Sequence, residues 1–150
     1  MKFFIAIVLL AALSSAEYTI KKREDLMKYR SECVEKLSVP TELLEKYKKW
    51  DFPDDATTHC YMKCILEKFE LFDEEKGFSV ENIHNQMVGG HHADHTDDTH
   101  AKIDKCSKEA TGADACERAY KGSMCFIREN LHLVQKSVHA HEHDHSAHHH

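Results

Sequence analysis

The sequence predicts an all-α fold, a compact bundle of about six helices. Apolar side chains recur at intervals of three and four residues through most of the chain, which is the period of a helix with one buried face. Prolines, glycines and aspartates divide this pattern at positions where helices begin or end. No alternating run of β-branched residues is long enough to form a strand.

Pro40 separates the first two predicted helices, because proline suits the first turn of a helix. The apolar stripe before it consists of Leu26, Tyr29, Cys33 and Leu37. The stripe after it consists of Leu43, Tyr47 and Trp50. Both stripes have helical spacing, so each segment is expected to bury one face.

A third helix is predicted after Pro53, Asp54 and Asp55. Its apolar stripe consists of Tyr61, Ile65 and Phe69, with Cys60 and Cys64 on a neighbouring stripe. We expect this helix to end near Gly77, because glycine readily adopts the left-handed conformation that closes a helix.

Three more helices are predicted in the second half of the chain. Ser79 is a candidate N-cap for a short fourth helix, which Gly89 and Gly90 would end. A fifth helix is expected after Thr96, with two aspartates at its positive end. The sixth is expected from about residue 113 to residue 130. The inward residues of the fourth and fifth helices would be Val80, Ile83, Met87, Ile103, Cys106 and Ala110.

The N-terminus has the pattern of a secretory signal peptide over residues 1–16. An unbroken apolar run from Phe3 to Leu13 follows Lys2, and Ser14 and Ala16 supply the small residues of a cleavage site. The run is far shorter than the roughly 20 residues needed to cross a bilayer. We therefore predict a secreted, extracellular chain without membrane insertion, with one domain over residues 17–138 and a histidine-rich tail over residues 139–150.

The predicted mature chain is acidic. The full sequence has 20 basic and 26 acidic side chains, and removal of residues 1–16 takes away only Lys2, which leaves 19 minus 26, or −7. Such a surface repels nucleic acids and anionic membranes. A neutral or apolar molecule is the expected partner, and the chain is expected to be a monomer or weak dimer.

All six cysteines are expected to form disulfides, because thiols pair in the oxidising compartments through which secreted proteins pass. They are Cys33, Cys60, Cys64, Cys106, Cys116 and Cys125. Cys60 and Cys64 lie one turn apart on the same helix face, so they can reach two different helices. A zinc site would need a second ligand pair, and a redox pair would need C-x-x-C spacing. The sequence by itself allows fifteen pairings.

The cysteine spacing C-x26-C-x3-C-x41-C-x9-C-x8-C resembles that of the insect odorant-binding proteins of the pheromone-binding and general odorant-binding group. The x3 and x8 intervals are the fixed ones of that family, and the resemblance extends from about residue 24 to residue 138. The segments that fit the family are EKYKKW at 45–50, PDDATTHCYMKC at 53–64, GFSVENIH at 77–84 and KGSMCFIRENLHLVQ at 121–135. Saposin-like and lipid-transfer proteins need C-x-x-C or adjacent cysteines, which this sequence lacks.

The resemblance implies three interlocked disulfides around an apolar cavity, which would join Cys33 to Cys64, Cys60 to Cys116 and Cys106 to Cys125. It implies a carrier of odorants, pheromones or lipid-like molecules that uses no cofactor, with a chemoreceptor as a further candidate partner. The candidate ligand-binding residues are Leu26, Tyr29, Leu66, Leu71, Phe72, Phe78, Ile83, Met87, Ala119, Phe126, Leu133 and Val134. Few polar groups are expected to face inward, and the candidates are Tyr29, His84 and Tyr120. The ligand is therefore expected to be mostly apolar, with at most one hydrogen-bonding group.

Two histidine-rich segments support an alternative function, the binding of zinc or copper by a secreted protein. The candidate metal ligands are His91, His92, His95, His139, His141, His143 and His145. The stretch HEHDH at 141–145 also matches the H-E-x-x-H motif of metalloproteases. It lies in a polar tail with nothing to shape a cleft, so we predict that the protein is not an enzyme.

The C-terminal residues predict a lid over the cavity. Leu131, Leu133, Val134 and Val138 form an apolar stretch that resembles the family's C-terminal segment, which often covers the pocket. Histidines become charged as the pH falls from about 7 to about 5, and a protonated His132 would resist burial. Residues 131–138 are therefore expected to loosen in mild acid and to release the ligand.

Overall fold

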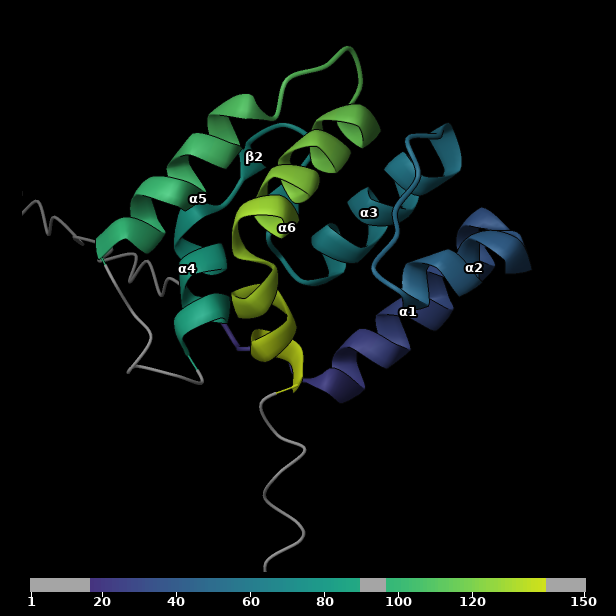
Figure 1. Cartoon of the computed structure of the whole chain (residues 1–150), viewed down its shortest axis with the longest axis horizontal. Coiled ribbons are helices and arrows are strands. Elements are labelled where there is room, and N and C mark those ends of the chain that lie inside the picture. The colour runs from purple at the N-terminus through teal and green to yellow at the C-terminus, as the bar shows by residue number, and fades with distance from the viewer. Residues whose placement is uncertain (1–16, 90–96, 140–150) are drawn as a thin grey trace, which may run out of the picture.

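The computed structural model describes residues 17–89 and 97–139, most of which are helical (Figure 1). The helices are α1 (Arg23–Leu37), α2 (Thr41–Lys48), α3 (Ala56–Lys68), α4 (Val80–Val88), α5 (Asp97–Glu109) and α6 (Ala115–His139). Helix α6 runs through the middle of the bundle, with α4 and α5 on one side and α1 to α3 on the other (Figure 1). The predicted all-α bundle is confirmed.

Three helices end in left-handed residues that are not glycine. Ser38, Trp50 and Glu70 follow α1, α2 and α3 with φ angles of 49°, 60° and 60°. The two N–H groups after each helix turn back to carbonyls of its last turn, as in the 2.9 Å bonds from Glu70 N to Glu67 O and from Leu71 N to Leu66 O. The predicted end of the third helix near Gly77 is therefore wrong, because Glu70 closes α3 after Lys68.

A small hairpin lies between α3 and α4, where the sequence predicts no strand. β1 (Phe72–Asp73) pairs antiparallel with β2 (Gly77–Phe78), and Phe72 lies opposite Phe78. The Asp73 carboxylate accepts two backbone hydrogen bonds of 2.9 Å within the turn, and Gly77 has a φ of 78°. Local turn chemistry thus makes this hairpin, which the search for an alternating pattern cannot detect.

The starts of two helices follow from capping side chains. Ser79 Oγ accepts a hydrogen bond from Asn82 N at 3.2 Å, which confirms the predicted N-cap of α4. Asp55 Oδ1 accepts one from Thr58 N at 2.7 Å at the start of α3.

Helix α6 extends beyond its predicted end at residue 130. Asn130 has non-helical angles (φ −138°, ψ 31°), and the chain then returns to helical geometry up to His139. Asn130 and Val138 are buried and Val134 is half-buried, at a spacing of four residues. This spacing gives the segment after Asn130 one inward face, so it packs as a short helix at an angle to the first part of α6.

Three disulfides connect the helices in the pairing that the family resemblance implies. Cys33–Cys64 joins α1 to α3, Cys60–Cys116 joins α3 to α6, and Cys106–Cys125 joins α5 to α6. All six cysteines are paired. Cys60 and Cys64 therefore reach two different helices from one face of α3.

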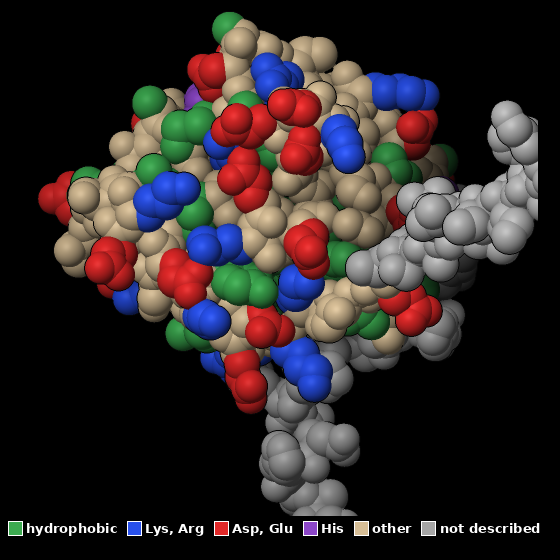
Figure 2. Space-filling view, turned by 180° about the vertical axis from the view of Figure 1, so that it is seen from behind, with side chains coloured by type: hydrophobic (Ala, Val, Ile, Leu, Met, Phe, Trp, Pro, Cys, Tyr) green, Lys and Arg blue, Asp and Glu red, His purple; other side chains and the backbone are tan. Residues whose placement is uncertain are grey.

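The surface carries charges of both signs. On the face seen in Figure 2, basic and acidic side chains are intermixed, so this face has no patch of one sign. Several charged side chains pair one turn apart on the same helix, such as Lys108 with Asp104 at 2.6 Å. Within residues 17–89 and 97–139, no helix is long and apolar enough to cross a membrane.

Candidate ligand-binding site

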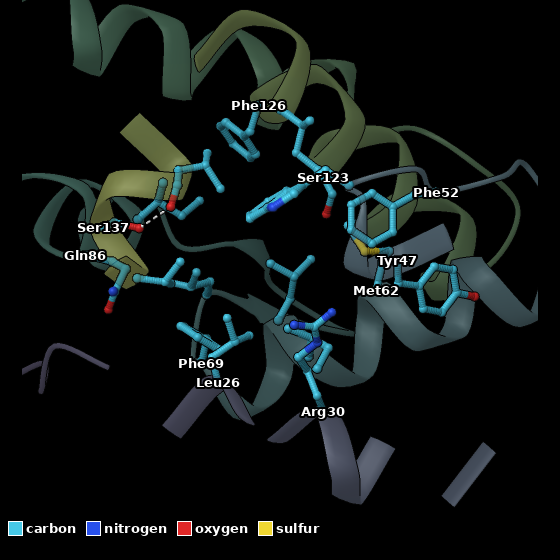
Figure 3. A pocket seen from close by; sticks show the side chains of 18 of the residues that line it. Leu26, Arg30, Tyr47, Phe52, Met62, Phe69, Gln86, Ser123, Phe126 and Ser137 are labelled. Atoms are coloured by element: carbon cyan, nitrogen blue, oxygen red, sulfur yellow. Dashed lines mark hydrogen bonds between the residues drawn. The ribbon is translucent and has the colours of Figure 1, made fainter. Parts of the chain in front are cut away.

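A cavity of about 360 Å³ lies inside the bundle (Figure 3). Side chains of α1, α2, α3, α4 and α6 line it, together with Phe78 of β2 and residues that follow α2 and α3. Helix α5 contributes none of the lining residues in the described part of the chain. The volume falls in the range of small-molecule pockets, about 300–1,000 Å³.

Eight of the twelve candidate ligand-binding residues line this cavity. They are Leu26, Leu66, Leu71, Phe78, Ile83, Met87, Phe126 and Val134. They come from four helices, from β2 and from the connection after α3, so residues far apart in sequence meet around one apolar space.

The other four candidates lie away from the lining. The Tyr29 ring packs edge-on against Phe69, with ring centroids 5.5 Å apart. Phe72 is buried with its ring against Phe78 at 4.9 Å, Ala119 is fully buried, and Leu133 is half-buried. Periodicity marks the buried side of a helix, but it does not separate the residues that face a void from those that face a neighbouring side chain.

The connection between α2 and α3 adds two aromatic lining residues that the sequence analysis missed. Trp50 and Phe52 lie in this connection, with their rings perpendicular and 6.2 Å apart. The spacing of Trp50 from Tyr47 is helical and predicts only that Trp50 is buried, whereas no helical period includes Phe52. The signal that could have identified them is the presence of two large aromatic side chains just after a helix end, where polar residues are usual.

Most polar groups of the lining are already hydrogen-bonded within the protein. Tyr47 Oη and Thr58 Oγ1 lie 2.7 Å apart, and Ser123 Oγ donates to Ala119 O at 2.7 Å. Ser137 Oγ donates to Val134 O at 2.8 Å (Figure 3). These groups have little capacity left for a ligand, which favours a mostly apolar one.

Gln86 is a buried lining residue that ties the N-terminal segment to α4. Its Oε1 accepts hydrogen bonds from Tyr18 Oη at 2.9 Å and from Lys21 N at 2.8 Å, and its Nε2 donates to Lys21 O at 2.9 Å. Its role is therefore structural.

The three candidate inward polar groups do not line the cavity. Tyr120 Oη donates to Phe52 O at 2.8 Å, and the Tyr120 ring stacks on His59. The His84 ring stacks on His100, with centroids 3.7 Å apart, and Tyr29 packs against Phe69. The prediction that these groups point into the cavity is wrong, because each is held by a neighbouring ring.

The charged residues of the lining are all basic: Arg23, Arg30 and Lys48. Arg30 lies one turn after Leu26 on α1, next to the phenol of buried Tyr61. Burial raises the pKa of the Tyr61 phenol, and the positive charge of Arg30 lowers it in part. Arg30 follows Leu26 by four residues and precedes Cys33 by three, so it lies on the same face of α1 as both. This spacing is the sequence signal that could have identified Arg30 as a lining residue.

The predicted lid segment lies against the cavity. Val134, Ser137 and Val138 belong to the lining, and all three follow the break at Asn130. His132 is exposed, so the expectation that it is buried in a closed lid is wrong.

The candidate metal ligands cannot be placed in this structure. Six of them lie outside the described residues: His91, His92, His95, His141, His143 and His145. The seventh, His139, ends the described range, and its side chain is not described. The predicted signal peptide at 1–16 and the tail after His139 also lie outside the described residues. Among the described residues, the one group with metal-ligand spacing is Cys106, Cys125 and Glu129. Both of these cysteines are disulfide-bonded, so this group is no metal site.

The sequence profile of the PBP/GOBP family matches residues 15–129, a range that includes all six cysteines. The chain belongs to the PBP/GOBP family. It is 51% identical to general odorant-binding protein 99a of Drosophila melanogaster over 139 residues, which are 92% of this chain and 97% of that protein. It is 41% identical to odorant-binding protein 22 of Aedes aegypti over 138 residues, 92% of this chain and 98% of that protein.

Solved structures of odorant-binding proteins have the same fold. Anopheles gambiae odorant-binding protein 22a with bound cyclohexanone has a TM-score of 0.60 and 26% identity, and the match covers 76% of this chain and 98% of that one. A structure of the same protein described as open for ligand binding has a TM-score of 0.60 and 29% identity, with 73% and 94% covered.

Members of the PBP/GOBP family are carriers of small hydrophobic ligands rather than enzymes, and this chain is such a carrier. The prediction that it is not an enzyme is confirmed. The comparisons give no support to the alternative function in metal binding.

Proposed function

We propose that the protein is a secreted, extracellular carrier that holds an odorant, a pheromone or a lipid-like molecule in the cavity of about 360 Å³. The observation that carries this proposal is the apolar lining contributed by five helices, in which most polar groups are bonded to the protein itself. Each buried CH₂ group of a ligand would add about 0.8 kcal/mol to binding. The bound cyclohexanone in the Anopheles protein supports a ligand of this class.

Secretion is supported by the signal-peptide pattern of residues 1–16 and by three disulfides, which form in oxidising compartments. Expression of the full chain in insect cells should deliver it to the medium. N-terminal sequencing should then find Glu17 as the first residue.

Ligand binding can be tested by displacement of a neutral naphthylamine probe. We expect apolar alcohols and esters to displace it at micromolar concentrations. Phe126→Asp should abolish binding, because it puts an uncompensated carboxylate beside the ligand. Arg128→Asp is the matched control, since residue 128 lies on the same helix with a largely exposed side chain.

A second variant covers the case in which Phe126→Asp does not fold. Leu26→Trp fills the cavity with an apolar ring and introduces no buried charge. Normal probe binding by a folded Leu26→Trp or Phe126→Asp protein would show that the ligand binds elsewhere.

We also propose that residues 131–138 form a lid that loosens in mild acid, which would let the carrier release its ligand, for example near a chemoreceptor. Support comes from the break at Asn130 and from Val134 and Val138 in the lining. Since His132 is exposed, it would act through its charge together with the histidines of the tail.

The lid can be tested with chains that end at Val138 and at Asn130. The full chain should bind the probe more weakly at about pH 5 than at about pH 7.5, because the histidines are then protonated. The chain that ends at Asn130 should bind weakly at both pH values, and the chain that ends at Val138 should lose most of the pH dependence. Equal binding by all three chains would exclude a lid.

A further inference from the structure

The charges that line the cavity have one sign. Arg23, Arg30 and Lys48 are lining residues, and no aspartate or glutamate of the described chain lines the cavity. The whole sequence has the opposite balance, with 26 acidic and 20 basic side chains. Composition therefore does not explain an apolar cavity with only basic charges on its wall.

Arg30 is the best placed of the three to meet a ligand. Lys48 is paired with Glu45 at 2.7 Å and its side chain is 62% exposed, and Arg23 is an exposed residue at the start of α1. Arg30 is half-buried, and its guanidinium extends from α1 into the pocket (Figure 3).

Within the described part of the chain, Arg30 has no carboxylate at ion-pair distance. The phenol of Tyr61 is a polar neighbour of Arg30. Tyr61 is 3% exposed, and its ring stacks on that of Tyr47 with centroids 4.5 Å apart. Since burial raises the pKa of Tyr61, this phenol is neutral at physiological pH and can donate a hydrogen bond.

A guanidinium and a neutral phenol at one wall of an apolar cavity match a specific ligand chemistry. A half-buried cation has lost part of its hydration, which costs free energy. An anionic group of the ligand that hydrogen-bonds to the cation offsets this cost better than a neutral group does. A carboxylate accepts two parallel hydrogen bonds from a guanidinium and can also accept one from a phenol. The rest of such a ligand must be hydrocarbon, because the remaining lining is mainly apolar.

We infer that the cavity selects a carboxylic acid with a hydrocarbon chain, with its ionised head group at Arg30 and Tyr61 and its chain among the apolar lining residues. This inference rests on the proposed carrier function and narrows the ligand to anionic amphiphiles. Arg30 and Tyr61 then determine specificity, while the apolar residues supply most of the affinity.

The test compares ligands that share one chain and differ in the head group. Dodecanoate, dodecanol and methyl dodecanoate are titrated against the neutral naphthylamine probe at neutral pH. We expect the full chain to bind dodecanoate about tenfold more tightly than dodecanol, because hydrogen bonds to charged groups exceed those between neutral groups. Arg30→Met should remove this preference by weakening the binding of dodecanoate about tenfold.

Two matched variants sharpen the result. Arg128→Met makes the same change at a largely exposed residue outside the lining, and it should keep the preference. Tyr61→Phe keeps the ring stacked on Tyr47 but removes the hydroxyl, so it should reduce the preference only in part. Arg30→Gln is used if circular dichroism shows that Arg30→Met does not fold.

The outcomes separate this inference from the proposed function. Equal binding of acid and alcohol by the full chain, or an unchanged preference in both Arg30 variants, would overturn the inference and leave the carrier function intact. If no ligand displaces the probe, the carrier function fails and the inference fails with it.

Discussion

Phe72 and Phe78 face each other across the hairpin, yet only one of them belongs to the cavity. Their ring centroids are 4.9 Å apart, and Phe78 also packs edge-on against Phe126 of α6 at 5.5 Å. Phe78 lines the cavity, whereas Phe72 is 5% exposed and does not. The pair therefore allows the contribution of a residue to stability to be separated from its contribution to binding.

Substitution of each phenylalanine by alanine should give opposite results. Phe72→Ala should lower the free energy of unfolding by about 3–5 kcal/mol, because it leaves a void in the packed core, and ligand affinity should change little. Phe78→Ala should cost less stability but weaken the binding of small ligands, because it enlarges the cavity. Thermal unfolding and probe titration check both. Equal affinity losses in the two variants would contradict this division.

The charge of Arg30 should be visible in the titration of Tyr61. A nearby cation favours the phenolate, so removal of the cation by Arg30→Met should raise the pKa of Tyr61 further above its ordinary value. NMR of tyrosine-labelled protein at alkaline pH can follow this residue. Arg128→Met serves again as the control, and an unchanged Tyr61 titration in Arg30→Met would show that the two side chains do not interact.

The raised pKa of Tyr61 also predicts how the stability of the protein changes at high pH. The folded-state pKa of Tyr61 lies above that of the unfolded chain, which is about 10. The folded state therefore binds more protons than the unfolded state in this range, and its stability should fall as the pH rises above about 10. A thermal midpoint that stays constant through this range would contradict the expectation.

The break in α6 at Asn130 is the main irregularity among the helices. Asn130 is buried, its Nδ2 has no hydrogen-bond partner among the described residues, and its angles are not helical. An unpaired buried donor costs about 1–3 kcal/mol. The break turns the last part of α6 so that Val134 and Val138 reach the cavity.

Asn130→Ala should test whether this break shapes the cavity. Alanine favours helical angles and carries no unpaired donor, so thermal stability should stay equal or rise. A straighter α6 would move Val134 and Val138 off the ligand, and affinity should fall about tenfold, the equivalent of a few buried CH₂ groups. Arg128→Ala on the preceding turn is the control. Unchanged affinity with higher stability would show that the break has no role in binding.

Helix positions could be predicted from the sequence better than helix ends. The apolar period of α1 to α6 depends on burial of one face, so it is visible in the residues themselves. Helices α1, α2 and α3 instead end at residues in left-handed conformations, which are Ser38, Trp50 and Glu70. These residue types do not favour a positive φ, so the sequence does not predict that they end a helix. The sequence therefore favours Gly77 as the end of the third helix, although Gly77 is the first residue of β2.

The cavity could be predicted only through the family resemblance, since periodicity identifies buried faces and not whether they enclose a void. For the same reason, the sequence does not identify Arg30 as a cavity residue. Its charge is typical of a surface residue, and only its helical spacing from Leu26 and Cys33 indicates that it lies on the inner face of α1. Periodicity favours Tyr29, three residues after Leu26, as a cavity residue, but α1 instead places Arg30, four residues after Leu26, at the cavity.

On the scale of the whole molecule, the described residues form two packed regions. One cluster of buried residues includes Tyr47 and Tyr61 near α1 to α3, and the other includes Ile103 and Phe126 near α4 to α6. Members of both clusters line the cavity. Protein interiors are usually packed without large voids, so a chain of this size needs another source of stability. Disulfides supply it by cross-linking the helices.

Two of the disulfides should differ in how much they hold the cavity lining in place. Cys33–Cys64 joins α1 and α3, which both line it, whereas Cys106–Cys125 joins α6 to α5, which contributes no lining residue in the described ranges. Their sequence separations are 31 and 19 residues, and chain entropy predicts similar contributions of about 3–4 kcal/mol. Stability alone therefore cannot distinguish the two bridges.

We expect ligand binding to distinguish them. Replacement of Cys33 and Cys64 by serine should lower both the thermal midpoint and the affinity, because α1 can then move and carry Leu26 and Arg30 away from the ligand. Replacement of Cys106 and Cys125 by serine should lower the midpoint by a similar amount and leave affinity nearly unchanged. Probe titration well below both midpoints, with circular dichroism to confirm folding, measures the difference. Equal affinity losses in the two double variants would mean that the cavity depends on the stability of the whole bundle rather than on the tie between α1 and α3.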